Sequence, residues 1–264
     1  MKSYDITILT DARYVNPKEQ NPYIQNVLDE DRLVAEALER KGVKVYRCAW
    51  DDPYMNWENT SHVLFRSTWD YFDRYAEFSK WLDEVQEKTI LINPKELIHW
   101  NVDKRYLKDL VSKGVKIPAT IFIETGEVKS LHELAIVTSW EEFILKPAIS
   151  GAARHTYRFT LAELDQYESI FKSLIANEAM LLQEYQKRIT TEGEVSFIVF
   201  SGAYSHAILK KARSGDFRVQ DDFGGSIHHY EATQEEKDFA ESVVAACKIL
   251  PAYARVDAMW DNKG

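Results

Sequence analysis

The stretch Phe143-Ile144-Leu145-Lys146-Pro147 decides the fold of this 264-residue chain, and the rest of the sequence can be read outward from it. A short apolar run of this kind, bounded by polar residues, is typical of a buried strand. A lysine at the end of such a strand needs an anionic partner, because burying a bare ammonium group is costly. That partner is either a structural Asp or Glu or the phosphate of a ligand, and the residues alone leave both possibilities open.

A loop of small residues, Ser150-Gly151-Ala152-Ala153, follows this strand. Small side chains let backbone N–H groups approach a phosphate closely, as they do in phosphate-binding nests. A plain flexible turn would have the same composition. The loop is not a Walker A motif, because the chain contains no GxxxxGK[ST], and it contains no GxGxxG either.

Residues 1–95 alternate between strand-like and helix-like patterns. The strand-like runs lie at 6–9, 43–46, 62–65 and 90–92, and helical periodicity lies at 29–41 and 75–87. This order predicts a small parallel sheet with helices on its faces. Arg66, Ser67 and Thr68 follow one of the predicted strands, and open α/β sheets bind ligands at the carboxyl ends of their strands. We therefore expect these three residues to anchor an acyl substrate.

The remainder of the chain combines helices with antiparallel strands. Helices are predicted at 102–113, 131–137, 161–175 and 235–250, and strands at 120–123, 143–145, 179–182, 195–200, 204–211 and 254–260. Lys104 lies in the first of these helices, where a solvated surface charge is the alternative to a ligand contact.

A second group of candidate ligand contacts follows the strand predicted at 179–182. Gln183, Glu184 and Tyr185 join two lobes, where backbone N–H and C=O groups can pair with the edge of an adenine. Glu194 could accept hydrogen bonds from the hydroxyl groups of a ribose. A glutamate that faces solvent is the alternative.

The composition excludes several classes of protein. A net charge of −9 argues against binding nucleic acid, since a phosphate backbone demands a basic face. Two widely separated cysteines, Cys48 and Cys247, form neither a disulfide framework nor a thiolate zinc site. No apolar run approaches the roughly 18 residues of a membrane span, and no signal peptide is evident. We therefore expect a cytoplasmic protein that contacts neither nucleic acid nor membrane.

The order and spacing of these segments resemble the ATP-grasp superfamily. The segments that carry the resemblance are Asn93-Pro94, Trp100–Lys104, Gly114–Thr120, Leu145-Lys146-Pro147 with Ser150-Gly151, Gln183-Glu184-Tyr185 with Gly193-Glu194, and Arg255-Val256-Asp257. Within the superfamily the chain is most similar to the glutathione-synthetase-like bacterial branch that includes the D-cycloserine-forming ligase. That similarity is carried by Arg66–Tyr71, Ser205–Lys210, Gly215–Gln220 and Gly224-Gly225.

The resemblance implies an α/β fold that becomes α+β in its last lobe. A parallel-sheet pre-ATP-grasp domain would cover residues 1–95. The central ATP-grasp subdomain would cover 96–182, and the C-terminal subdomain 183–264.

The resemblance also implies an ATP-dependent carboxylate ligase of the carboxylate–amine type, which acts on a small amino-acid-like carboxylate through an acyl phosphate. Its cofactors would be ATP and Mg²⁺, and homodimers are common in such families. The residues implied to bind ATP are Lys104, Lys146, Ser150, Gly151, Gln183, Glu184, Tyr185 and Glu194. Arg218 and Lys210 would be catalytic, and Asp257 would bind the metal.

One part of the family pattern is absent. Asp261-Asn262-Lys263-Gly264 is a turn signature, which predicts a returning strand. In the family that strand carries a Glu-x-Asn pair that binds metal, and no such pair follows. We therefore expect a truncated C-terminal subdomain, and a chain that binds ATP weakly with little or no turnover. The alternative is a nucleotide-binding regulatory module, or an inactive homologue with an incomplete metal site.

Overall fold

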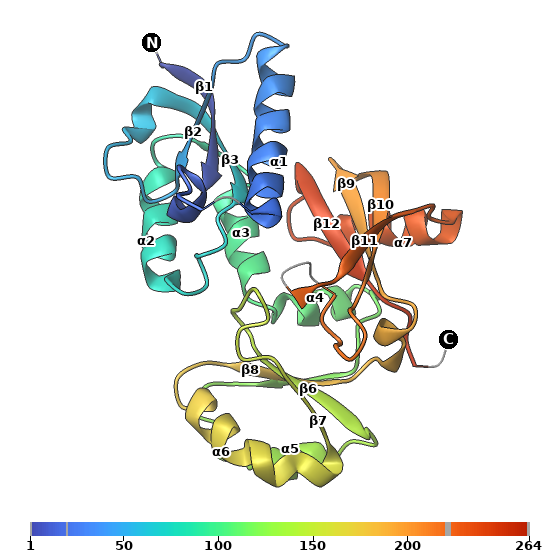
Figure 1. Cartoon of the computed structure of the whole chain (residues 1–264). Coiled ribbons are helices and arrows are strands. Elements are labelled where there is room, and N and C mark those ends of the chain that lie inside the picture. Colours follow the sequence, from blue (N-terminus) through green and yellow to red (C-terminus); the bar gives the residue numbers. More distant parts are fainter. Residues whose placement is uncertain (1, 20, 220–222, 263–264) are drawn as a thin grey trace. The chain divides into compact units, whose positions relative to one another are not determined.

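A computed structural model of the chain describes residues 2–19, 21–219 and 223–262 (Figure 1). The chain forms two compact units, the first ending at His99 and the second beginning at Trp100. Each unit is described by itself below. The three-part division at residues 95 and 182 stays a prediction.

The first unit is a four-stranded parallel sheet in the order β2-β1-β3-β4. Its strands are β1 (Tyr4–Thr10), β2 (Val45–Ala49), β3 (Thr60–Ser67) and β4 (Ile90–Ile92). Its helices are η1 (Ala12–Tyr14), α1 (Pro22–Glu39), η2 (Trp57–Asn59) and α2 (Tyr75–Val85), and α3 (Lys95–Val102) continues past His99. The predicted parallel sheet with flanking helices is confirmed.

The core of this unit is strongly aromatic. Helix α2 buries Phe78, Leu82 and Val85, which recur at helical spacing along one face. Phe78 and Trp81 stack with ring centroids 5.7 Å apart, and Trp50 meets both rings edge-on. This packing fixes the loops that follow β2 and β3.

Helix α1 starts seven residues before the predicted position. Asn21 accepts a hydrogen bond from the Ile24 N–H at 2.9 Å, and Pro22 occupies the first helical turn. An asparagine cap followed by proline is a strong helix start. The weak apolar periodicity of the first two turns hid this signal.

The second unit contains two four-stranded antiparallel sheets. The first has the order β5-β8-β6-β7, from β5 (Thr120–Ile123), β6 (Glu142–Pro147), β7 (Tyr157–Thr160) and β8 (Met180–Glu184). The second has the order β11-β10-β9-β12, from β9 (Glu194–Phe200), β10 (Ala203–Lys211), β11 (Ser226–Tyr230) and β12 (Tyr253–Ala258). The helices are α4 (Tyr106–Ser112), α5 (Leu131–Ala135), η3 (Leu161–Glu163), α6 (Leu164–Ile175), η4 (Lys187–Thr190) and α7 (Gln234–Ala245).

Each of these sheets is covered by helices on one face. Helices α5 and α6 share one apolar core with β5, β6, β7 and β8, and α7 shares another with β9, β10 and β12 (Figure 1). The predicted change from a parallel first lobe to antiparallel sheets is thereby confirmed. Strands β7 and β11 were not predicted, because β7 spans four residues and β11 is exposed along most of its length.

The predicted helix over 102–113 is wrong in its first half. Helix α3 ends at Val102, α4 begins at Tyr106, and Lys104 lies in the turn between them. The Asp103 carboxylate accepts a hydrogen bond from the Arg105 N–H at 2.9 Å, and such a local bond competes with helix continuation. The Lys104 N–H instead donates to the Ala148 carbonyl at 2.9 Å, which ties this turn to the end of β6.

No helix among residues 2–19, 21–219 and 223–262 is long and apolar enough to cross a membrane.

Candidate functional site

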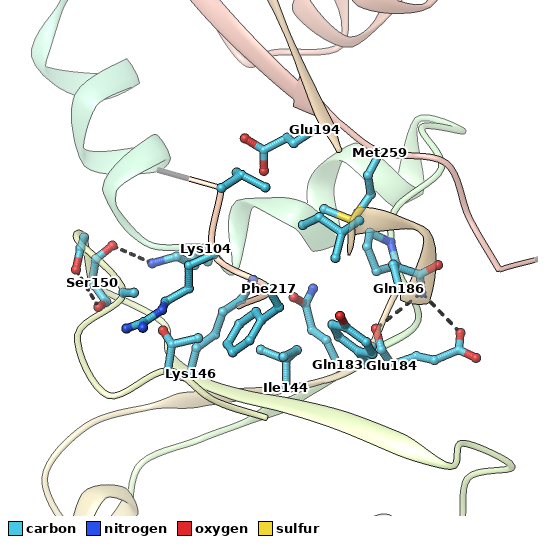
Figure 2. Close-up of a pocket in the computed structure, with 18 of the residues that line it drawn as sticks. Lys104, Ile144, Lys146, Ser150, Gln183, Glu184, Gln186, Glu194, Phe217 and Met259 are labelled. Carbon is cyan, nitrogen blue, oxygen red and sulfur yellow. Dashed lines mark hydrogen bonds between the residues drawn. The ribbon is translucent and has the colours of Figure 1, made fainter. Parts of the chain in front are cut away.

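A cavity of about 380 Å³ lies in the second unit, within the size range of small-ligand pockets (Figure 2). Its walls come from β6, the loop after β6, the end of β8, the start of β9, the loop after β10 and the end of β12. The predicted ATP-binding residues all line it, and these are Lys104, Lys146, Ser150, Gly151, Gln183, Glu184, Tyr185 and Glu194. The predicted catalytic Arg218 lines it too. Residues spread over more than a hundred positions therefore meet at one place.

Two lysine ammonium groups point into this cavity (Figure 2). Lys104 Nζ donates to the backbone carbonyl of Ser150 at 2.7 Å, with a longer contact to that of Ala148 at 3.4 Å. Lys146 forms no ion pair within 4.0 Å among the described residues, although the charge of Glu194 acts on it from farther away. Burial lowers the pKa of each lysine to about 8, and for Lys104 the nearby charge of Lys146 adds to the effect. Two cations that are destabilised in this way provide a strong attraction for an anion.

The loop after β6 holds several residues in the left-handed backbone region. Ala152, Ala153 and His155 have φ angles of 47°, 54° and 50°. Within the described ranges, the backbone N–H groups of Ala152 and Ala153 have no hydrogen-bond partner. Strained backbone with free donors beside two lysines is the arrangement expected of a phosphate-binding loop.

Arg154 stabilises this loop through contacts with Glu178 and Ile149. Its guanidinium group forms an ion pair with Glu178 at 2.5 Å and donates to the Ile149 carbonyl at 3.0 Å. The Ser150 hydroxyl in turn donates to the Arg154 carbonyl at 3.0 Å. These contacts hold the loop in shape and involve neither Lys104 nor Lys146.

The segment from Gln183 to Gln186 forms the opposite wall. Gln183 and Glu184 end strand β8 rather than lying in a free linker, and Gln183 Nε2 donates to Thr120 Oγ1 at 2.7 Å. The N–H of Glu184 donates to Ala119, and that of Tyr185 donates to Glu142. The Glu184 carbonyl accepts a long hydrogen bond from Gln186 Nε2 at 3.3 Å, and the Gln186 N–H has no partner among the described residues. One acceptor and one donor, two residues apart, thus remain available at the cavity wall.

A cluster of opposite charges lies beside Glu194. Lys210 Nζ contacts Glu194 at 3.0 Å and Asp257 at 3.6 Å. Asp257 also accepts from Ser196 Oγ at 2.5 Å and from Arg255 at 2.8 Å. Lys210 and Asp257 contact a cavity residue but do not line the cavity themselves. The predicted catalytic lysine is therefore paired with two carboxylates.

The two carboxylates of this cluster titrate in opposite directions. Burial and the charge of Asp257 raise the pKa of Glu194 above its ordinary value, against the opposing effect of Lys210. Burial also opposes ionisation of Asp257, but Arg255 and Lys210 outweigh it and hold the Asp257 pKa below its ordinary value. Asp257 therefore gives up its proton more readily than Glu194 does.

Arg218 lies in the loop between β10 and β11. Its guanidinium forms a bidentate pair with Asp216, at 3.0 and 2.7 Å, and lies 3.7 Å from the centre of the Phe223 ring. Hydrogen bonds from Arg218 hold the pKa of Asp216 well below its usual range. Gln220, the last residue of the motif quoted above, lies outside the described residues.

The sequence reasoning missed the apolar walls of the cavity. Ile144, Phe217 and Met259 line it, and Figure 2 places Phe217 between Ile144 and the two lysines. Strand alternation could have found Ile144, because residues two apart on a strand share a face and Lys146 was already selected. Arg255 was quoted only as part of a motif, yet it lines the cavity as well.

The predicted substrate anchor lies in the first unit. Ser67 is buried, its hydroxyl pairs with Thr10 Oγ1 at 2.7 Å, and it also contacts Asp31 at 3.3 Å. Arg66 contacts Glu30 at 3.2 Å, and its buried Nε lies 3.8 Å from the Asp31 carboxylate. The Ser67 hydroxyl thus connects β1, β3 and α1, whereas the Arg66 side chain stays 28% exposed.

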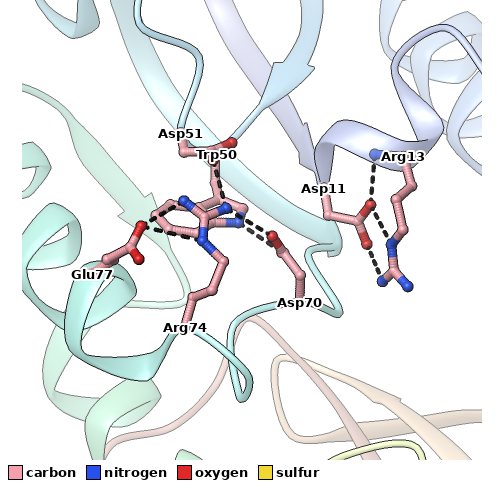
Figure 3. Close-up of polar contacts among 7 residues, drawn as sticks. All are labelled: Asp11, Arg13, Trp50, Asp51, Asp70, Arg74 and Glu77. Atoms are coloured by element: carbon pink, nitrogen blue, oxygen red, sulfur yellow. Dashed lines mark hydrogen bonds and ion pairs between the residues drawn. The ribbon is translucent and has the colours of Figure 1, made fainter.

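Further charged groups follow the carboxyl ends of β1, β2 and β3 (Figure 3). Buried Asp11 grips Arg13 through both oxygens, while the Arg13 side chain is 62% exposed. Arg74 contacts Asp51 at 2.7 Å and Asp70 at 3.2 Å, and Asp70 accepts from the Trp50 indole N–H at 2.8 Å. This is the edge of a parallel sheet at which open α/β folds bind ligands.

Comparison with known proteins places these observations in a family. Residues 108–264 match the RimK-like ATP-grasp domain, and residues 6–93 match the N-terminal domain of D-cycloserine synthetase DcsG. The cycloserine biosynthesis protein DcsG of Streptomyces lavendulae is 32% identical over 181 residues, which are 67% of this chain. The match covers 60% of that relative, so the chain spans less than two thirds of its length.

Solved structures agree with this placement. The crystal structure of D-cycloserine synthetase DcsG superposes with a TM-score of 0.84 at 27% identity, over 98% of this chain and 88% of that one. D-alanine–D-alanine ligase from Bacillus anthracis, complexed with ATP, gives a TM-score of 0.64 at 15% identity, over 98% and 82% of the two chains. The latter likeness concerns the fold alone. The resemblance and the fold class predicted from the sequence are confirmed, and the chain belongs to the RimK-like ATP-grasp domain family.

Proposed function

We propose that the chain is an ATP-dependent carboxylate ligase of the carboxylate–amine type, which activates a small amino-acid-like substrate as an acyl phosphate. The observation that carries this proposal is the pair of destabilised cations, Lys104 and Lys146, at one end of a cavity that also has a hydrogen-bonding wall. A triphosphate would place negative charge next to Lys146, on which only the more distant charge of Glu194 acts among the described residues. ATP-grasp ligases as a family use ATP, which supports this reading.

The nucleotide would lie with its phosphates toward Lys104, Lys146 and the loop at Ser150 and Gly151. Lysine ammonium groups suit this role as compact point charges. The base would lie against the apolar walls made by Ile144, Phe217 and Met259.

The edge of the base would pair with the segment from Gln183 to Tyr185 and its continuation. The acceptor there is the Glu184 carbonyl and the donor is the Gln186 N–H. Glu194 would accept the ribose hydroxyls.

In the reaction, a substrate carboxylate oxygen attacks the γ-phosphorus of ATP, and ADP leaves. An amine nitrogen then attacks the acyl carbon of the acyl phosphate, loses a proton and releases inorganic phosphate. Both steps need cations around the transferring phosphoryl group and the developing oxyanion. Arg218 is the candidate for this stabilisation, with Lys210 in support.

Arg66, Ser67 and Thr68 are proposed to anchor the acyl substrate. Arg66 is the best supported of the three, since its side chain is 28% exposed whereas Ser67 and Thr68 are buried.

Mg²⁺ belongs to this proposal. It binds through one or two protein carboxylates together with phosphate oxygens and waters. Asp257 is the protein carboxylate proposed to hold it, and its oxygens contact Ser196, Arg255 and Lys210 in this structure. The ion would supply charge neutralisation of the phosphates. Homodimer formation stays a prediction from the resemblance, and a cytoplasmic location stays a prediction from the sequence composition.

The test is nucleotide binding, followed by turnover. Lys146→Ala should weaken ATP binding in calorimetry at least tenfold, because it removes the unpaired ammonium group. Lys80→Ala, at a lysine whose side chain is 80% exposed, is the matched control. Wild type should release ADP over repeated turnovers only when Mg²⁺, a carboxylate and an amine are all present, because without the amine the reaction stops at the acyl phosphate. Absence of any ATP binding by wild type at millimolar concentration would overturn the proposal.

A second candidate function is a nucleotide-binding regulatory module or an inactive ATP-grasp homologue. The observation that favours it is the engagement of Asp257 by Arg255 and Lys210. In addition, no cluster of three metal-ligating side chains occurs in the described ranges. ATP binding without ADP release under any substrate condition would select this candidate.

A further inference from the structure

Asn262 is tied to the wall of the cavity by its side chain and its backbone. Its Oδ1 accepts from the Lys187 N–H at 2.8 Å, and its Nδ2 donates to the Tyr185 carbonyl at 2.9 Å. Its own N–H donates to Gln186 Oε1 at 3.1 Å. One asparagine therefore contacts each of the residues 185–187 from a position about 75 residues later in the chain.

These contacts use backbone groups on both sides of Gln186. The Lys187 N–H is used by Asn262 Oδ1 and is not available to a ligand, and the Tyr185 carbonyl already accepts one hydrogen bond from Asn262 Nδ2. The acceptor and donor that remain are the Glu184 carbonyl and the Gln186 N–H. Asn262 therefore determines which backbone groups of this wall can recognise a base.

The remaining pair matches an adenine in its hydrogen-bonding pattern. Adenine presents an amino group as donor next to a ring nitrogen as acceptor. An amino group can donate to the Glu184 carbonyl, and the ring nitrogen can accept from the Gln186 N–H. Hypoxanthine has a carbonyl oxygen and an N–H in these places. Its carbonyl oxygen would face the Glu184 carbonyl, and its N–H would face the Gln186 N–H, so neither hydrogen bond could form. A site that hydrogen-bonds one pattern rejects the other, because buried polar groups would be left unpaired.

The Gln186 side chain also connects Asn262 with the Glu184 carbonyl. It is 6% exposed, and its amide is held by Asn262 on one side and contacts the Glu184 carbonyl on the other. Its Nε2 occupies the acceptor through a long contact of 3.3 Å, which an amino group of a base can replace. If Asn262 were lost, both the backbone of residues 185–187 and this side chain would be free to reorient.

We propose that Asn262 is a positioning residue that fixes residues 185–187 for adenine recognition and so sets the base specificity of the site. The proposal rests on the function proposed above, because it assumes that the base of ATP lies at this wall. Asn262 contacts no phosphate-binding residue among those described, so its effect should be confined to the base.

The experiment compares three ligands on four proteins by calorimetry. The ligands are ATP, ITP, which has hypoxanthine as its base, and inorganic tripolyphosphate, which has no base. The proteins are wild type, Asn262→Ala, Asn262→Asp and the control Asn177→Ala. Asn177 donates a comparable side-chain hydrogen bond to the Ser173 carbonyl at 3.1 Å, at the end of α6.

Asn262→Ala should weaken ATP binding about tenfold, the equivalent of one or two net hydrogen bonds. The preference of wild type for ATP over ITP should fall by a similar factor, while tripolyphosphate binding should change less than about twofold. Asn262→Asp keeps the acceptor for Lys187 but opposes the Tyr185 carbonyl with a second oxygen, so it should weaken ATP binding as well. Asn177→Ala should leave all three affinities unchanged.

Three outcomes would overturn the inference. ATP affinity of Asn262→Ala could equal that of wild type, ATP and tripolyphosphate could weaken together, or wild type could bind ATP and ITP equally. Melting temperatures of the variants identify a general loss of folding, and the retained tripolyphosphate affinity shows that the rest of the site is intact. Failure of wild type to bind ATP would instead contradict the proposed function.

Discussion

The two cavity lysines, Lys104 and Lys146, combine a shared location with weakened basicity. Their pKa values of about 8 arise from burial, and for Lys104 also from mutual repulsion. A lysine in the unfolded chain titrates near 10.4. Between pH 8 and about 10, the folded protein therefore binds fewer protons at these positions than the unfolded protein does.

This difference predicts opposite pH dependences for stability and for ATP binding. From pH 8 toward 10 these lysines should raise the free energy of unfolding, because the unfolded state holds more protons. Over the same range ATP affinity should fall, because the triphosphate favours the ammonium forms. Urea unfolding and calorimetry at pH 7 to 10 would measure both, with Lys146→Met as reference. Identical pH profiles for wild type and Lys146→Met would contradict the assignment.

The backbone conformation of Gly193 determines how closely the start of β9 approaches Lys210. Its φ angle is +94°, and a Cβ atom there would collide with the backbone carbonyl of Lys210. Gly193→Ala should therefore cost about 1–3 kcal/mol of stability and displace Glu194 from Lys210.

Gly126→Ala is the matched control for this substitution. Gly126 also has a positive φ angle, of +81°, but a Cβ there would meet no atom within 4 Å. Urea unfolding should show a larger loss for Gly193→Ala than for Gly126→Ala. Equal losses would mean that the collision with Lys210 is relieved without cost.

Helix α1 is joined to the first sheet by a buried ion pair. Asp31 is 1% exposed, contacts Arg47 on β2 at 2.7 Å and accepts a bond from Ser67 at the end of β3. Asp31→Asn should cost about 3–5 kcal/mol, because it leaves a largely buried guanidinium group without its counter-charge. Glu36→Gln on the exposed side of the same helix should cost less than 1 kcal/mol. Denaturant unfolding of the two variants tests this difference, and comparable losses would argue against a structural role for the pair.

The elements themselves show what could be predicted from the sequence. Strands β1, β3, β4, β6 and β9 were predictable because their apolar runs are continuous or alternate cleanly. The break between α3 and α4 was missed because it depends on a bond from the Asp103 side chain and on the contact of Lys104 with Ala148. Periodicity carries no information about contacts of that kind.

The residues of the cavity were likewise only partly predictable, because some of them belong to no local pattern. Its charged residues belong to recognisable motifs, whereas Phe217 and Met259 are ordinary apolar residues whose role appears only when distant segments come together. The contacts of Asn262 with residues 185–187 likewise join segments that no local pattern connects.

At the scale of the whole molecule, the chain separates into two units, and the cavity lies entirely in the second. A ligand that binds only the folded state stabilises the part of the molecule that it contacts. ATP alone should therefore slow amide hydrogen exchange in β6, β8 and the loop at 150–153, and leave β1 to β4 unchanged. A carboxylate substrate held by Arg66 should add protection at the end of β3. Equal protection of β1 to β4 by ATP alone would contradict the assignment of ATP binding to the second unit.

The ammonium group of Lys146, which forms no close ion pair within the described ranges, has a practical consequence for work with this protein. Any compact dianion can satisfy it, so sulfate and inorganic phosphate would compete with the nucleotide when they are present as buffer or precipitant. At equal ionic strength these ions should stabilise the unliganded fold more than chloride does, since they bind a site as well as screening charge. Assays in phosphate buffer would then understate nucleotide affinity, and sulfate-grown crystals would show the loop at 150–153 already closed around an anion.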